Sequence, residues 1–274
     1  MLPTDAPGEP LSDTPTKKFG KYEAISQLGA GAMGVVWRAR DPILGRTVAI
    51  KTISAALGSD DENKQRFLRE AQAAAQLNHP NIITIHDFGQ EDEELYMAME
   101  LLEGKDLKEL ISGGRLSLDE KLDIMEQVAD GLAYAHLHRV QHRDIKPANI
   151  LIASSGAPLL ADFGIAKQQN DEFTGLTVQN FRSGPYAPPE QEATLPYVRD
   201  VYGIGVVMLQ CLCDVPIKDF PDIQRALEAI RVPPDIRKLL ERCVDPEPTE
   251  RPANGRVLAD EFRQLVRDGI ADVQ

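Results

Sequence analysis

A glycine-rich segment between two strand-like stretches restricts the fold of this chain more than any other feature. Gly29, Gly31 and Gly34 follow a GxGxxG pattern, and the stretches on both sides (KYEAISQLG and GVVWRARD) are typical of a hairpin. Glycines let the backbone approach phosphate oxygens and point its N–H groups at them. The dinucleotide-binding fingerprint has the same spacing but opens a helix. The hairpin context therefore argues against such a domain, although on this segment alone an ordinary glycine-rich hairpin is an equal alternative.

The remaining pattern divides the chain into a strand-rich part and a helix-rich part. RTVAIKTI, NIITIHDFG and LYMAMELL read as strands, interrupted by one helix expected over residues 61–77. From residue 104 onward apolar residues recur at helical spacing, and Ser117 with Glu120 forms a capping-box pattern. We therefore expect an α+β fold of two lobes, a small β-rich lobe over residues 19–103 and a larger helical lobe over 104–268. A ligand site between the lobes is expected.

The two ends of the chain are expected to lie outside this folded unit. Residues 1–18 carry four prolines among small polar residues and predict a flexible leader. Residues 269–274 form a short tail that could lead into further domains. The most apolar run, residues 203–213, is shorter than the ~18–20 residues that a bilayer requires. The domain itself is therefore expected to be cytoplasmic, while a longer parent chain could be tethered to a membrane.

Net charge restricts the kinds of partner that this chain can bind, and cysteine content indicates its compartment. The net charge is -13 and the pI about 4.9, so the average field would repel a nucleic acid backbone. The three cysteines, Cys211, Cys213 and Cys243, are too few for a disulfide framework and indicate a reducing compartment. Burial as small apolar side chains is a better interpretation of them than metal ligation.

A lysine on an apolar strand is the second candidate feature. Lys51 ends the sequence Val-Ala-Ile-Lys, and burying an ammonium is costly unless it meets anions. Phosphate oxygens would supply those anions, and Glu70 on the following helix could hold the ammonium in place. Taken alone, a surface lysine with a buried stem would be the better interpretation.

A polar loop between two apolar segments is the third feature. In the sequence HRDIKPAN, Asp144, Lys146 and Asn149 fall within six positions. The aspartate could orient a hydroxyl and accept its proton, the lysine could neutralise a moving phosphoryl group, and the amide oxygen could bind a metal ion. A polar turn that satisfies its own backbone is the alternative, and the apolar flanks disfavour it.

A carboxylate at the end of an apolar stretch completes the set. Asp162 opens the sequence Asp-Phe-Gly directly after NILIASSGAPLLA. A carboxylate at the end of a buried strand favours a bound cation. As an isolated tripeptide it would more often be a turn.

Taken together, the order and spacing of these four features resemble the protein kinase superfamily over about residues 19–265. DIKPAN resembles serine/threonine rather than tyrosine kinases. QLGAGAMGVVWRARD, REAQAAAQLNHPNI and DFGIAK resemble the bacterial, Hanks-type branch. The resemblance implies a bilobal fold and transfer of the γ-phosphoryl group of ATP, with Mg²⁺ or Mn²⁺, to Ser or Thr hydroxyls of proteins.

The resemblance also implies a role for each residue of the site. Asp144 would be the catalytic base, with Lys146, Lys51, Glu70 and Asn149 completing the catalytic set; Lys51 would contact the phosphates and pair with Glu70. Asn149 and Asp162 would hold the metal ion. The implied ATP-binding residues are Leu28, Gly29, Ala30, Gly31, Ala32, Met33, Gly34, Val36, Ala49, Lys51, Met99, Glu100, Leu102, Leu151 and Asp162.

Structural and regulatory roles follow from the same resemblance. Asp200 would brace the catalytic loop, and Glu190 would pair with Arg251. Arg143, directly before Asp144, implies activation by phosphorylation, because a free guanidinium there would pair with a phosphate. The hydroxyl candidates of the activation segment are Thr174, Thr177 and Ser183. The rival hypothesis is a kinase that is always active, with Glu172 on Arg143. A homodimer for autophosphorylation in trans is a further implied partner.

The sequence departs from the family at two places. Arg182-Ser183 stands where the family usually has Gly-Thr, and Pro188 replaces an alanine before Pro189 and Glu190. The chain is also short over residues 190–200 and 213–233, and the second gap normally holds a helix that docks substrates.

Two other classes of function stay open: a pseudokinase or scaffold that binds nucleotide without transfer, and a small-molecule kinase of the aminoglycoside type. The intact catalytic set and the HRDIKPAN loop argue against both.

Overall fold

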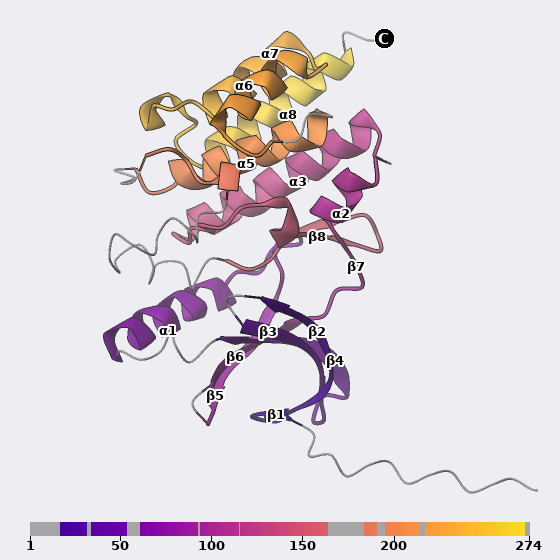
Figure 1. Cartoon of the computed structure of the whole chain (residues 1–274), viewed down its shortest axis with the longest axis vertical. Coiled ribbons are helices and arrows are strands. Elements are labelled where there is room, and N and C mark those ends of the chain that lie inside the picture. Colours follow the sequence, from indigo (N-terminus) through magenta and orange to yellow (C-terminus); the bar gives the residue numbers. More distant parts are fainter. Residues whose placement is uncertain are drawn as a thin grey trace, which may run out of the picture.

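The computed structural model describes residues 17–31, 34–53, 61–92, 94–114, 116–163, 184–190, 195–213 and 217–271. These residues form two lobes stacked along the long axis of the molecule, with the strands of the first lobe at one end and the helices of the second at the other (Figure 1). The expected α+β architecture is therefore confirmed.

The small lobe is one antiparallel sheet with a single helix beside it. Its elements are β1 (Lys18–Phe19), β2 (Tyr22–Gly31), β3 (Gly34–Asp41), β4 (Arg46–Ile53), α1 (Asp61–Ala75), β5 (Ile85–Glu91) and β6 (Glu94–Glu100). The strand order is β1-β2-β3-β4-β6-β5. The glycine-rich segment joins β2 to β3, as expected, and Lys51 on β4 lies opposite Val36 on β3 and Met97 on β6. Lys51 is thus held in the middle of the sheet.

The first sheet begins at Lys18, one residue before the predicted start of the folded lobe. Lys18 pairs with Glu23 in the β1–β2 ladder, and the fully buried Phe19 packs against Trp37 and Tyr96 with ring centroids 6.1 and 5.9 Å apart. Aromatic burial of this kind anchors the start of the fold. Residues 1–16 lie outside the described part of the chain.

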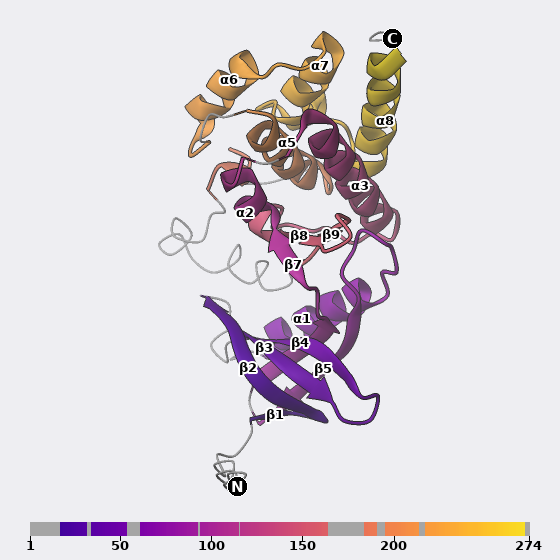
Figure 2. The same cartoon turned by 90° about the vertical axis from the view of Figure 1, so that its right-hand side faces the viewer.

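The large lobe contains a small second sheet below a set of helices. Its elements are β7 (Gly104–Asp106), α2 (Leu107–Ser112), α3 (Leu118–Leu137), η2 (Pro147–Asn149), β8 (Ile150–Ala153), β9 (Pro158–Leu160), η4 (Gly184–Tyr186), α5 (Val198–Leu212), α6 (Phe220–Ala229), α7 (Pro234–Cys243), η5 (Pro248–Glu250) and α8 (Gly255–Ala271). The three strands β7, β8 and β9 lie between the first sheet and the helices (Figure 2). The capping box of Ser117 and Glu120 starts α3 as expected.

Helix α5 forms the centre of the helical lobe. Most of its side chains are buried, and it contacts α3, α6, α7 and α8. Its apolar sequence follows from this position, because a helix packed on all sides shows no polar stripe. Cys211 on α5 and Cys243 on α7 are free and buried, and burial raises the pKa of each thiol to about 12. No helix in the described ranges combines the length and hydropathy needed to cross a bilayer.

Helices also occupy two segments of the large lobe for which no helix was predicted. A helix does occupy the short segment before Pro233: α6 is capped by the Asp219 side chain and buries Ile223, Ala226 and Leu227. These three buried residues are spaced three and four apart, which is typical of one face of a helix. Helix α8 also continues to Ala271, into the expected tail.

Candidate active site

The loop between α3 and β8 brings the three expected polar side chains together. The Lys146 ammonium lies 2.9 Å from Asp144 Oδ2, and the Asn149 amide nitrogen donates to Asp144 Oδ2 at 3.1 Å and to the Asp144 backbone oxygen at 2.8 Å. Asp144 and Asn149 are 4% and 5% exposed. The short helix η2 sets this spacing, since Asn149 N–H donates to Lys146 O and closes the turn. The Asp144 carboxylate is therefore fixed in orientation.

Asp200 braces this loop from below, as the family resemblance implied. Its two carboxylate oxygens accept the backbone N–H groups of His142 and Arg143, each at 2.7 Å. Asp200 is 1% exposed. Burial alone would raise the pKa of this carboxyl, but hydrogen bonds from His136 and the loop hold the pKa below its ordinary value. Asp200 is thus an anion that fixes the backbone before Asp144.

His136 is a positioning residue that sequence reasoning missed. Its Nε2 lies 3.0 Å from Asp200 Oδ2, and its Nδ1 accepts the Gly255 N–H at 2.8 Å. Because Nδ1 accepts, the proton sits on Nε2 and is donated to Asp200. His136 follows Val128 and Leu132 at spacings of four on the buried face of α3. A polar residue at a buried helical position was the available signal.

Lys51 meets Asp162 where the two lobes approach each other. The ammonium lies 2.8 Å from Asp162 Oδ1. Asp162 lies two residues after the end of β9 and has a φ of 58°, a left-handed conformation that is uncommon for residues other than glycine. Arg143 shares this feature with a φ of 62°. Such backbone strain is typical of functional sites.

The expected pair between Lys51 and Glu70 is not formed. Glu70 on α1 instead accepts from Arg143, with Oε1 2.6 Å from the guanidinium, and within the described part of the chain Lys51 is paired with Asp162. The expectation of an unpaired Arg143 is therefore also wrong in this structure. The cause is the placement of α1, which puts Glu70 against the catalytic loop rather than against β4.

The residues expected to hold a metal ion fit that role chemically. The Asn149 nitrogen is occupied by Asp144, which leaves its oxygen as a ligand, and Asp162 keeps one carboxylate oxygen beyond its bond to Lys51. Oxygen ligands of this kind suit Mg²⁺. Among the described residues no group of three or more His, Cys, Asp or Glu side chains is placed to hold a metal ion by itself, so an ion here would take further ligands from phosphate and water.

The residues expected to contact the nucleotide belong to both lobes. Ala49 and Met99 are buried and lie opposite each other on β4 and β6, while Leu28 is 52% exposed at the sheet end. The others in the described part are Gly29, Ala30, Gly31, Gly34, Val36, Glu100, Leu102 and Leu151. The Glu100 N–H donates to Thr84 O, which leaves only its backbone oxygen for a ligand. Their contacts with ATP stay predictions.

Several expected residues lie outside the described part of the chain. These are Ala32 and Met33 of the glycine-rich segment and Glu172, Thr174, Thr177, Arg182 and Ser183 of the activation segment.

Glu190 and Arg251 form the expected pair. The guanidinium of Arg251 makes two hydrogen bonds to the Glu190 carboxylate, at 2.6 and 2.9 Å. The Arg251 side chain is fully buried. The doubled proline does not prevent this contact, and Pro188 is itself buried.

The two lobes together have the parts of a phosphotransferase. The β-rich lobe carries a glycine-rich hairpin and a lysine. The helical lobe presents Asp144, Lys146, Asn149 and Asp162. The model of the protein kinase domain matches residues 22–263. The chain therefore belongs to the protein kinase family.

Relatives named as serine/threonine-protein kinases are similar to it. It is 41% identical over 196 residues to the serine/threonine-protein kinase PrkC of Bacillus subtilis, covering 70% of this chain and 30% of that protein. It is 35% identical over 259 residues to PknA of Mycobacterium tuberculosis, covering 88% of this chain and 60% of that protein. The crystal structure of the Mycobacterium tuberculosis PknI kinase domain superposes with a TM-score of 0.72 at 28% identity, covering 93% of this chain and 100% of that one.

The chain spans less than two thirds of the curated relatives that it matches, from 30% of PrkC to 60% of PknA. Its fold is that of a protein kinase domain.

Proposed function

We propose that this domain transfers the γ-phosphoryl group of Mg·ATP to Ser or Thr hydroxyls of protein substrates. The observation that supports this most directly is the assembly of Asp144, Lys146 and Asn149 by hydrogen bonds of 2.8–3.1 Å, with the bonded pair Lys51 and Asp162 on the other side. A pseudokinase would be expected to have lost one of these groups, and the relatives described above are named as kinases. Incubation with radiolabelled ATP and a basic carrier protein tests transfer directly.

The chain's own groups divide the work as follows. Asp144 orients the acceptor hydroxyl and takes its proton, because its carboxylate is nearly buried and held by Asn149. Lys146, bonded to the same carboxylate at 2.9 Å, neutralises charge on the transferring group. Lys51 holds the phosphates in line with Asp144. Positioning of this kind accounts for most of the catalysis in phosphoryl transfer.

The metal ion is proposed to be Mg²⁺, with Mn²⁺ as a substitute, held by Asn149 and Asp162. When bound, it neutralises phosphate charge. Asp162→Asn should weaken Mg·ATP binding by roughly tenfold or more, since it removes a charged oxygen ligand. Affinity for ATP without metal should change much less. Calorimetric titration with and without Mg²⁺ tests this, and an equal loss under both conditions would remove Asp162 from the metal site.

Regulation is proposed to act through Arg143. In this structure Glu70 holds the guanidinium at 2.6 Å, so neither is available to its expected partner. A phosphate on Thr174 or Thr177 would compete for Arg143, since a dianion attracts a guanidinium more strongly than one carboxylate does. Release of Glu70 would let it pair with Lys51. The two ion pairs Glu70–Arg143 and Lys51–Asp162 would then mark the unphosphorylated form.

Autophosphorylation should therefore raise the transfer rate on the order of 5- to 150-fold, the usual size of such a coupling. Sites can be mapped by mass spectrometry, and the rate compared before and after phosphatase. The double variant Thr174→Ala/Thr177→Ala should stay slow, while Thr249→Ala, at an exposed threonine of η5, should respond like the wild type. If phosphatase leaves the rate unchanged, Arg143 has no such role. A specific rate that rises with enzyme concentration would support transfer in trans within a transient homodimer.

The setting of the domain is also proposed rather than observed. We infer that this domain acts in the cytoplasm. Because the relatives are longer, we also infer that it is one part of a larger chain, which could be tethered to a membrane.

A further inference from the structure

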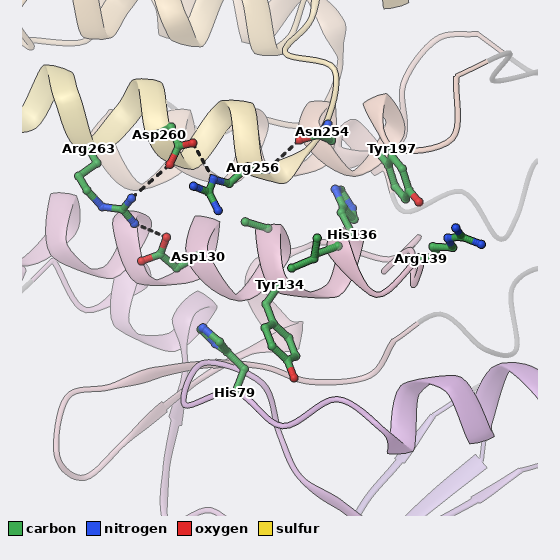
Figure 3. A pocket seen from close by; sticks show the side chains of 12 residues that line it. His79, Asp130, Tyr134, His136, Arg139, Tyr197, Asn254, Arg256, Asp260 and Arg263 are labelled. Carbon is green, nitrogen blue, oxygen red and sulfur yellow. Dashed lines mark hydrogen bonds and ion pairs between the residues drawn. The ribbon is translucent and has the colours of Figure 1, made fainter.

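A cavity lies behind the catalytic loop and shares only His136 with the site described above. It has a volume of about 740 Å³ and lies beside the C-terminal half of α3, the first turns of α8 and the start of α5. Figure 3 shows Arg256, Asp260 and Arg263 on α8 facing α3, with Tyr134 and His79 on the other side of α3. This volume is in the range of pockets that bind small molecules.

The carboxylates of the cavity are already neutralised. Asp260 pairs with Arg256 at 2.6 Å and with Arg263 at 3.4 Å, and Asp130 pairs with Arg263. Three of the groups that remain can donate hydrogen bonds. The Asn254 side-chain oxygen accepts two N–H groups at the start of α8, whereas its nitrogen and the Tyr134 hydroxyl donate to no described residue. The Arg139 guanidinium likewise makes no bond to a described residue and is exposed.

Arg139 occupies a position that suits glycine. It follows His138, the C-cap of α3, with a φ of 62°, and the bonds Arg139 N–H to His136 O and Val140 N–H to Ala135 O close the helix end. In this Schellman motif the left-handed residue is usually glycine, which avoids the strain of a side chain. A strained arginine at the mouth of a donor-rich cavity suggests that the guanidinium has a function there.

We infer that this cavity binds a small aromatic oxyanion, whose charged end pairs with Arg139 and whose ring lies against apolar surface of the cavity. Ala133, Leu137 and Tyr197 supply that surface, whereas the Tyr134 ring is already packed against His79 and His138. Only the His136 side chain would separate the bound oxyanion from Asp200, which holds the catalytic loop, because His136 lines the cavity and binds Asp200.

Phenyl phosphate is a suitable probe, with phenol as its uncharged control. Titration calorimetry is carried out on the whole domain saturated with Mg²⁺ and a non-hydrolysable ATP analogue, so that the nucleotide site is filled. Phenyl phosphate should bind saturably and phenol should not. Arg139→Gly should weaken binding by about ten- to a hundredfold, the effect of one charge-assisted hydrogen bond. Arg139→Lys should lose less, because a point charge remains.

The melting temperature shows whether a loss of phenyl phosphate affinity comes from the missing guanidinium or from a damaged fold. Glycine relieves the left-handed strain at residue 139, so Arg139→Gly should keep its Tm within about 3 °C of the wild type. Arg231→Gly is the matched control: Arg231 is exposed between α6 and α7, makes no ion pair among the described residues and lies outside the cavity. The proposal is wrong if phenyl phosphate does not bind, if Arg139→Gly binds it as the wild type does, or if Arg231→Gly loses as much affinity.

Discussion

Replacing Asp144 by asparagine should abolish most phosphoryl transfer while leaving nucleotide binding intact. The carboxylate acts on the acceptor hydroxyl, which takes no part in binding Mg·ATP, and a positioned general base contributes about 10²- to 10⁴-fold to a rate. Asparagine is the informative replacement because its side-chain oxygen can still accept from Asn149 and Lys146, which bind the aspartate at 3.1 and 2.9 Å. The loop should therefore keep its shape. Single-turnover transfer and calorimetric titration of Mg·ATP measure the two effects separately.

An exposed aspartate gives the matched control for that experiment. Asp119→Asn, in the first turn of α3, removes the same charge at an exposed position and should leave both measurements unchanged. A loss of Mg·ATP affinity in Asp144→Asn comparable to its loss of rate would place Asp144 in nucleotide binding instead. Retention of the full rate would deny it any role as a base.

The catalytic loop could be predicted closely because its contacts are local. Asp144, Lys146 and Asn149 lie within six positions, and one turn of 3₁₀ helix brings them together regardless of how the lobes are arranged. The pairing of Lys51 could not be predicted in this way. It depends on how α1 lies against β4 and the helical lobe, and the sequence offers two acids, Glu70 and Asp162, to one lysine and one arginine.

The sequence carries little signal for residues that act through another side chain. His136 lies in a helix that reads as apolar, and its role appears only when α5 brings Asp200 to within 3.0 Å. Arg139 was equally hidden, because its left-handed backbone follows from how α3 ends rather than from any motif. Helix α6 has local signals of its own, the capping residue Asp219 and an apolar face, which the length of the segment does not reveal.

Removal of the Arg251 side chain should destabilise the domain more than any other change proposed here. The side chain is fully buried, and besides Glu190 it donates to Asp245 O at 2.7 Å and Pro246 O at 3.3 Å. Its guanidinium carbon also lies 4.9 Å from the centre of the Tyr202 ring. Breaking one side of a buried ion pair costs about 3–5 kcal/mol, because the remaining charge is left without a partner. For a domain of this size the Tm of Arg251→Ala should fall by roughly 6–20 °C.

Thermal melts with two further variants test whether burial is the cause. Arg256→Ala removes an arginine whose side chain is 73% exposed and whose partner Asp260 lies on the same helix, so its Tm should change little. Glu190→Gln should cost less than Arg251→Ala, since the arginine keeps its bonds to Asp245 O and Pro246 O and gains a neutral acceptor, whereas alanine leaves the Glu190 carboxylate and both backbone oxygens without their donor. An Arg251→Ala melt within about 2 °C of the wild type, or a larger loss in Glu190→Gln, would mean that the pair contributes little to the free energy of unfolding.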